Sequence, residues 1–128
     1  MISYLDRVAW NDQGLDPAIA VDATSDRRLI QAWVNRETVA TAVAEKRAVY
    51  WPRSRKKLWS KGEESGNVQK LLEIRLDCDG EAICYRVEQI GGIACHTGGA
   101  HCFYQRLENE ARVTTDEVLV EPEQLYKT

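Results

Sequence analysis

A stretch of alternating residues near the middle of the chain constrains the fold most. From residue 72 to residue 79, apolar residues and a cysteine alternate with charged residues. This period of two is typical of a half-buried strand. The Asp79-Gly80 pair is a hairpin turn signal, and the segment 82–90 supplies a returning strand. The pattern therefore predicts an antiparallel hairpin that has Asp77 and Asp79 on one face and Cys78 on the other.

The remaining segments predict strands around one helix. Short apolar runs over 17–22 and 29–34 indicate two strands joined by a polar turn. Asn35 is a suitable cap for an amphipathic helix over 36–46, and residues 48–51 form a strand that Pro52 ends. We expect a loop over 54–67 and a solvated acidic segment over 105–128. Residues 1–128 are thus expected to form one small, β-rich α+β domain.

Composition excludes several classes of protein. The 128 residues are 44% hydrophobic and 29% charged, which is ordinary for a globular domain. No run reaches the roughly 20 apolar residues that span a bilayer, and acidic residues interrupt the first 20 positions, so we expect a cytoplasmic protein. The formal net charge of -3 argues against bulk nucleic acid as a partner. We therefore expect neither a nucleic-acid nor a membrane partner.

The cysteines and histidines are confined to one part of the chain. All four Cys and both His lie between positions 78 and 102. Disulfides are disfavoured in the cytoplasm, which leaves metal binding, redox chemistry or buried thiols. Cys95 and Cys102 do not have CxxC spacing, but together with Cys78 they form a set of three thiolates on a glycine-rich scaffold. Three ligands and an open position are typical of catalytic zinc. We expect Cys84 to be a small buried thiol.

Other polar residues suggest further roles, each with a simpler alternative. The carboxylates of Asp77, Asp79 and Glu81 suit Mg²⁺, although polar residues before a turn would read the same way. His96 beside a candidate ligand is placed for general acid or base chemistry, but a lone histidine is also often structural. His101 is expected to lie behind the ligands or on the surface.

A basic run over 53–57 precedes a glycine-containing loop over 61–67. Guanidinium groups and loop N–H groups together bind phosphate well, and Trp51 and Trp59 add stacking surfaces. A phosphorylated nucleotide fits this combination. The alternative is a solvated charged face.

Three motifs carry a family resemblance. The segments PRSRKKLWSKGEESGN (52–67), RLDCDGEA (75–82) and ACHTG (94–98), closed by CFY (102–104), resemble the phosphoribosyl-AMP cyclohydrolase family of histidine biosynthesis. The resemblance extends from about residue 17 to residue 104. It implies hydrolysis of the N1–C6 bond of the adenine ring of 1-(5-phosphoribosyl)-AMP by an intertwined homodimer that depends on zinc and magnesium.

The resemblance also implies a set of site residues. The zinc ligands are Cys78, Cys95 and Cys102, with Cys78 contributed by the partner subunit. The magnesium ligands are Asp77, Asp79 and Glu81, and His96 transfers protons. We expect the substrate to contact Arg53, Arg55, Lys61, Glu63, Ser65 and Gly66.

The sequence departs from the family pattern at two positions. Glu81 stands where the family usually has Asp, which lengthens that carboxylate by one methylene, and Pro52 replaces the usual Ser. Only 24 residues follow Tyr104, so we expect a monofunctional chain without a fused pyrophosphatase domain. The competing hypothesis is a non-catalytic, zinc-stabilised module that binds a nucleotide or a protein.

Overall fold

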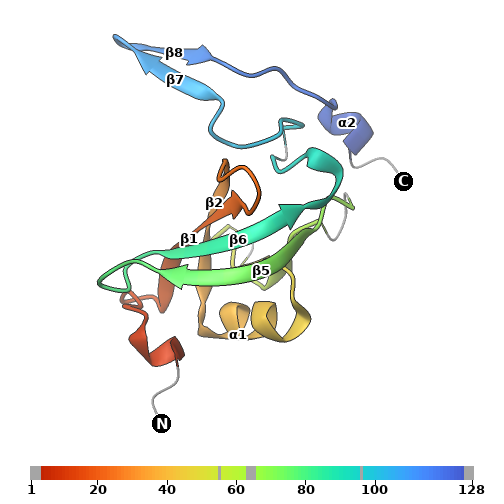
Figure 1. Ribbon diagram of the computed structural model, residues 1–128. Coiled ribbons are helices and arrows are strands. Elements are labelled where there is room, and N and C mark those ends of the chain that lie inside the picture. The colour runs from red at the N-terminus through yellow and green to blue at the C-terminus, as the bar shows by residue number, and fades with distance from the viewer. Residues whose placement is uncertain (1–3, 55, 63–65, 96, 126–128) are drawn as a thin grey trace.

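A four-stranded sheet is the centre of the molecule (Figure 1), in a computed structural model that describes residues 4–54, 56–62, 66–95 and 97–125. The sheet consists of β1 (Leu15–Asp22), β2 (Arg28–Asn35), β5 (Gln69–Leu76) and β6 (Ile83–Gln89). The strand order is β2-β1-β6-β5. Strand β1 is antiparallel to β2 and parallel to β6, and β5 and β6 form the predicted antiparallel hairpin. The α+β class, strand-rich with one main helix, is confirmed.

The helix α1 (Arg36–Glu45) begins at the predicted cap. The Asn35 side chain accepts a hydrogen bond from the Thr38 N–H, and the Thr38 hydroxyl accepts one from the Asn35 N–H, both at 2.8 Å. This reciprocal pair satisfies two N–H groups at the start of the helix. Thr38, Val39 and Ala42 are buried, whereas Val43 on the same helix is 44% exposed.

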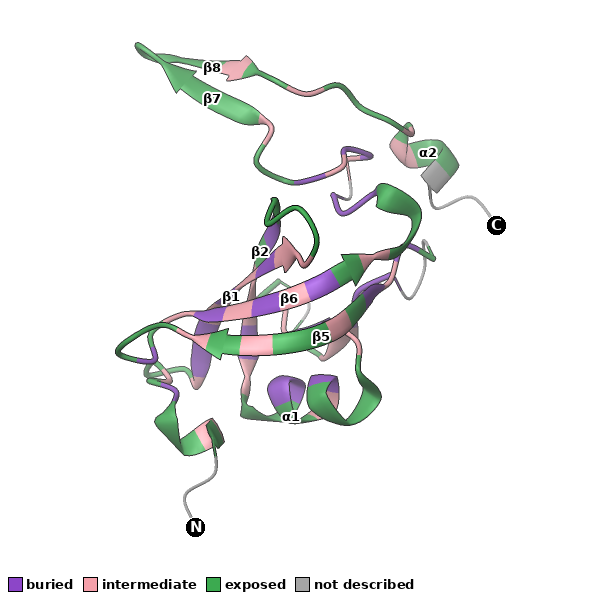
Figure 2. Cartoon of the chain, viewed as in Figure 1, coloured by how far each residue is buried: buried purple, intermediate pink, exposed green. Residues whose placement is uncertain are grey.

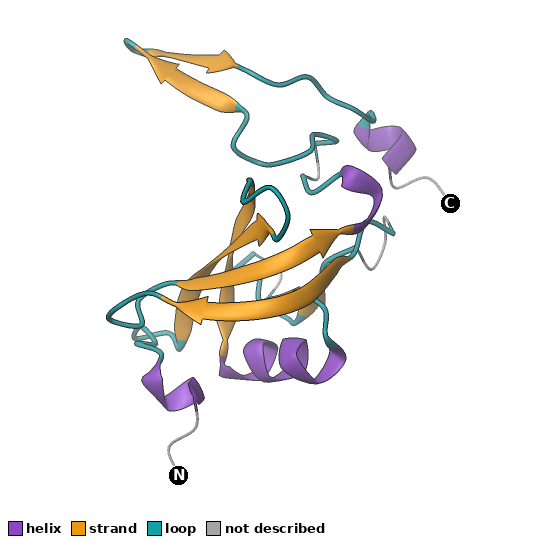
Figure 3. Ribbon diagram, in the orientation of Figure 1, coloured by secondary structure: helices purple, strands orange, loops and turns teal. Residues whose placement is uncertain are grey.

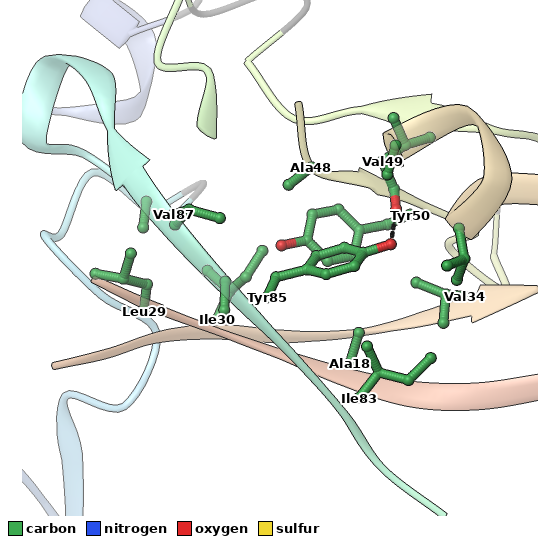
Figure 4. Close-up of a cluster of buried hydrophobic side chains, with 14 of the residues drawn as sticks. Ala18, Leu29, Ile30, Val34, Ala48, Val49, Tyr50, Ile83, Tyr85 and Val87 are labelled. Carbon is green, nitrogen blue, oxygen red and sulfur yellow. Dashed lines mark hydrogen bonds between the residues drawn. The ribbon is translucent and has the colours of Figure 1, made fainter. Parts of the chain in front are cut away.

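Two short strands contribute further residues to the core. Strand β3 (Val49–Tyr50) pairs with β4 (Trp59–Ser60), which lies inside the segment expected to be a loop. Local composition does not reveal this pairing, because the paired residues are 9 and 11 positions apart in the sequence. The Tyr50 and Tyr85 rings lie 5.6 Å apart in the core between the sheet and α1 (Figure 4), and Tyr85 donates a hydrogen bond to the Val49 carbonyl.

Strand β5 is displaced from its predicted position. It occupies 69–76 rather than 72–79, because its register against β6 begins at Gln69 opposite Gln89. A bulge between Leu71 and Glu73 leaves Leu72 unpaired and 54% exposed, although the alternation had placed it on the apolar face. The expectation that Asp77 and Asp79 oppose Cys78 across a strand is therefore wrong, since all three lie in the turn after β5.

The C-terminal segment is largely exposed, as predicted, but it contains regular secondary structure. After the short turn η2 (Ile90–Gly92), the strands β7 (Gln105–Glu108) and β8 (Ala111–Thr114) form an exposed hairpin that projects from the body, and α2 (Pro122–Leu125) follows (Figures 2 and 3). At the other end, the short 3₁₀ turn η1 (Tyr4–Arg7) precedes β1. None of the described helices is long and apolar enough to cross a membrane.

One carboxylate is buried where the sheet meets the β5–β6 turn. Asp16 on β1 is 2% exposed, and its Oδ2 atom has no hydrogen-bond partner among the described residues. Burial, together with the nearby charges of Asp77, Glu81 and Asp79, raises the pKa of Asp16 to about 6. Ionised Asp16 therefore opposes folding.

We expect Asp16→Asn to stabilise the protein at neutral pH. The folded pKa of about 6 exceeds the unfolded value of 3.8, so Asp16 costs stability progressively as pH rises from about 4 to 6. Since one pKa unit corresponds to about 1.4 kcal/mol, the shift of roughly two units costs on the order of 3 kcal/mol at pH 7.5. Urea unfolding of both proteins in EDTA, from pH 4 to pH 7.5, measures it. A stability difference that stays constant with pH would contradict the prediction.

Candidate active site

Two of the predicted zinc ligands lie side by side. Cys95 is buried in the loop after η2, and its thiol lies 2.9 Å from the Thr97 hydroxyl. Cys102 is exposed as a residue, yet the pKa of its thiol is raised to about 12, mainly by burial. The charge of Cys95 and a hydrogen bond with it also contribute to this rise, and Lys61 acts against it. The two thiols therefore belong to one site.

Backbone contacts hold the two cysteines in place. The Cys95 N–H donates to the Gly99 carbonyl at 3.1 Å, and the Cys102 N–H donates to the Leu29 carbonyl at 2.6 Å. Gly98 has a φ of +94°, and a Cβ there would overlap the Val120 carbonyl oxygen. Only glycine therefore permits this close approach of the loop and the C-terminal segment.

Lys61 lies beside the thiol pair. It follows β4, it is 4% exposed, and its Nζ atom lies 5.4 Å from the centre of the Trp59 ring. Burial lowers the pKa of Lys61, while the charges of Cys102 and Cys95 raise it. The sequence had assigned Lys61 to a phosphate-binding loop, and its burial against thiols had no signal in the local pattern.

Cys78 lies at the other end of the β5–β6 hairpin. It is exposed in the turn between the two strands, whereas Cys95 follows the far end of β6. Cys84, expected to be buried, is half-buried on β6, where burial raises its pKa. Within one chain, therefore, Cys78 does not join the thiol pair. In the described part of the chain, no three His, Cys, Asp or Glu side chains are grouped to hold a metal ion.

The three predicted magnesium ligands share one exposed turn. The Oδ1 atoms of Asp77 and Asp79 accept hydrogen bonds from the Glu81 N–H at 2.8 and 3.2 Å. Burial tends to raise the pKa of Asp77, but hydrogen bonds from Asp79, Glu81 and Ala82 lower it overall. Asp77 is therefore held as a carboxylate, which is the form that binds cations.

The two histidines differ in what the structure describes. His96 lies outside the described residues. His101 is buried, so the surface alternative is wrong. Its Nδ1 atom accepts a hydrogen bond from the Phe103 N–H at 3.0 Å, and its Nε2 atom lies 3.3 Å from the Asp116 carboxylate. Asp116, which the sequence did not suggest, therefore orients the residue next to Cys102.

The basic loop borders a shallow hollow of about 540 Å³, lined by Gln13, Leu15, Trp51, Arg53, Ser54 and Lys56. The Arg53 guanidinium lies 4.6 Å from the centre of the Trp33 ring. Gly66 is exposed, and its N–H donates to the Gly62 carbonyl. The candidate substrate residues Arg55, Glu63 and Ser65 lie outside the described residues.

Comparison with known proteins identifies the family. Residues 30–104 match the family model of phosphoribosyl-AMP cyclohydrolase. The chain is 55% identical over 127 residues to phosphoribosyl-AMP cyclohydrolase of Pseudomonas aeruginosa (strain LESB58), covering 99% of this chain and 95% of that protein. The same enzyme of Pseudomonas savastanoi pv. phaseolicola is 56% identical (98% and 97%), and that of Azotobacter vinelandii is 54% identical (99% and 96%). The chain therefore belongs to the phosphoribosyl-AMP cyclohydrolase family of enzymes.

Proposed function

We propose that this enzyme hydrolyses the N1–C6 bond of the adenine ring of 1-(5-phosphoribosyl)-AMP, a step of histidine biosynthesis. Family membership over nearly the whole chain supports this reaction. The observation that carries the proposal is the side-by-side arrangement of Cys95 and Cys102 in a glycine-rich loop. We place the enzyme in the cytoplasm, which keeps thiols reduced as this site requires.

Zinc fits the donor chemistry of the thiol pair. Cys95 and Cys102 supply two soft ligands, and Cys78 supplies a third from a second chain, because it lies at the far end of its own hairpin. The functional unit is then a homodimer with two shared sites. When bound, zinc acidifies a water molecule so that hydroxide is available near neutral pH.

His96 moves the proton in this proposal. It accepts a proton from the attacking water as the oxygen bonds to C6, and it delivers that proton to N1 as the N1–C6 bond breaks. The second proton of the water passes to the exocyclic nitrogen on C6, so the adenine ring opens and C6 becomes a carboxamide carbon. His101 and Asp116 position the neighbouring loop through their contact.

Magnesium fits the turn that contains Asp77, Asp79 and Glu81. Carboxylate oxygens are the donors that Mg²⁺ prefers, and two of these carboxylates already point to the same N–H group. Glu81 is exposed and lies in the turn between β5 and β6, so its longer side chain has room to adjust its position. In this proposal, the role of the magnesium ion is to orient a phosphate or a ribose of the substrate.

The two 5′-phosphates require cationic and N–H partners. We assign the phosphates to Arg53, Arg55 and Lys61 of the basic loop, and other contacts with the substrate to Glu63, Ser65 and Gly66. Support comes from Arg53, which lies at the rim of the hollow and is held against Trp33. A guanidinium fixed in this way loses little freedom when it binds phosphate.

Ultraviolet absorbance tests the reaction itself. Adding 1-(5-phosphoribosyl)-AMP to metal-replete enzyme should change the spectrum with turnover, because ring opening alters the chromophore. Cys95→Ser should lower the rate by more than about 100-fold. Removing a group that only supports a metal ligand commonly lowers activity by about 10–100-fold, and loss of the ligand itself should cost more. Asp77→Asn should raise the magnesium concentration that is needed for half-maximal activity. Binding without a spectral change would favour the non-catalytic module.

Metal content tests the ligand set. Purified protein should carry about one Zn²⁺ per chain, and Cys95→Ser or Cys102→Ser should lose most of it. Cys84→Ser is the matched control. The Cys84 thiol lies on β6, away from the Cys95–Cys102 loop, so this variant should keep its zinc. Elemental analysis after gel filtration measures the ratio. Equal loss in all three variants would exclude this assignment.

Mixing inactive variants tests the shared site. Cys78→Ser and Cys95→Ser proteins, unfolded and refolded together, should form dimers in which one site collects both defects and the other is native. Random pairing makes about half of the dimers mixed, so roughly a quarter of wild-type activity should return. Refolding each variant alone is the control. Mixed dimers that remain inactive would show that all three cysteines act within one chain.

A further inference from the structure

We propose that Asp16 is a fourth carboxylate of the magnesium site at the β5–β6 turn, where its buried negative charge strengthens binding of the cation. The inference deepens the proposed function and rests on the ligands Asp77, Asp79 and Glu81 assigned there. Neither the sequence pattern nor the family resemblance suggests Asp16 as part of this site, because it lies on β1, far from the turn in the sequence.

The first support is a buried oxygen atom. Asp16 is 2% exposed, and its Oδ2 atom has no hydrogen-bond partner among the described residues. Nearly all buried polar atoms in folded proteins have a partner, and a buried carboxylate is usually paired with a cation or coordinates a metal. A cation bound at the turn supplies the partner that this oxygen requires.

The second support is the position of Asp16 in the sheet. Strand β1 runs parallel to β6, with Ala18 opposite Ile83, and these two side chains lie together in the core (Figure 4). Side chains two positions apart share one face of a strand, so Asp16 lies on the face of Ala18 and, in the same register, beside position 81. Its side chain therefore points to the end of the core at which the turn joins β6.

The segment before β1 links Asp16 to the turn. The Ala9 N–H donates a hydrogen bond to the Gly80 carbonyl at 2.8 Å. Two residues later, the Asn11 N–H donates to the Leu15 carbonyl at 2.8 Å, and the Asn11 Oδ1 atom accepts from the Leu15 N–H at 3.0 Å. These contacts hold the start of β1 and the turn against the same short segment, and Asp16 directly follows Leu15.

The donor set at this corner suits a hard cation. Asp77 and Asp79 converge on the Glu81 N–H, so Asp16 adds a fourth negative charge to a group of three. Like charges gathered in one place are unfavourable without a cation. Mg²⁺ prefers oxygen ligands and keeps several of its water molecules, so carboxylates act as direct ligands and as acceptors for these waters. The charge of Asp16 is favourable in either place.

This arrangement couples folding to magnesium binding. Burial of an ionised carboxylate without a cation is unfavourable, which is why Asp16 opposes folding of the metal-free protein. A cation at the turn relieves this cost in the folded protein alone. Magnesium should therefore stabilise a chain that has Asp16 more than a chain that lacks the charge.

Magnesium affinity of Asp16 variants tests the inference. Mg²⁺ is titrated into zinc-loaded protein at constant ionic strength, and calorimetry gives its affinity. Asp16→Asn keeps the shape of the side chain but removes its charge, so it should weaken magnesium binding about 10-fold or more. Asp12→Asn makes the same change of charge at an exposed residue before β1 and is the matched control, which should bind as wild type does. Zinc content should stay at the wild-type level in both variants.

Urea unfolding of zinc-loaded protein gives an independent readout. Added Mg²⁺ should raise the unfolding midpoint of wild type more than that of Asp16→Asn, because the ligand stabilises the folded state according to its affinity. The stability advantage of Asp16→Asn should therefore shrink as magnesium is added. An advantage that is the same with and without magnesium would overturn the inference.

The outcomes separate this inference from the function on which it rests. Wild-type magnesium affinity in Asp16→Asn, with a loss in Asp77→Asn, would overturn the inference alone. Equal losses in Asp16→Asn and Asp12→Asn would also overturn it, because overall charge rather than position would then matter. Normal magnesium binding in Asp77→Asn would instead refute the proposed magnesium site. Circular dichroism checks folding, and Asp16→Ala replaces the Asn variant if that one unfolds.

Discussion

A buried chain of hydrogen bonds connects the core to the loops that carry the site. The Tyr50 hydroxyl donates to the Gln69 side chain at 2.6 Å, and Gln69 donates to the Gln89 side chain at 2.9 Å. Gln89 donates in turn to the Asn67 carbonyl at 2.8 Å. Because Tyr50 and Gln69 are fully buried, every one of these polar groups needs its partner.

This chain determines how three elements meet. Tyr50 lies on β3, Gln69 begins β5 and Gln89 ends β6, so the register of the hairpin and the position of the small β3–β4 sheet depend on each other. Lys61 follows β4, and the Cys95 loop follows the end of β6. The polar core therefore fixes the backbone at Lys61 and the start of the Cys95 loop relative to each other.

The β5–β6 hairpin separates the two sets of predicted metal ligands. Its turn carries Cys78 and the carboxylates, and its open end leads to Cys95 and Cys102. A strand rises about 3.3 Å per residue, so the seven residues of β6 place the two ends more than about 20 Å apart. A site that uses Cys78 together with the thiol pair thus has a physical reason to be shared between chains.

The amino-acid pattern alone determined the features that depend on neighbouring residues. The cap at Asn35, the Asp79-Gly80 turn, the hairpin and the set of residues able to bind metals follow from local geometry and side-chain chemistry. Only the tertiary structure decided the displacement of β5, the pairing of β3 with β4, the burial of Asp16 and Lys61, and the contact between His101 and Asp116. Each of these depends on contacts between segments distant in sequence, where packing and buried charge outweigh local preference.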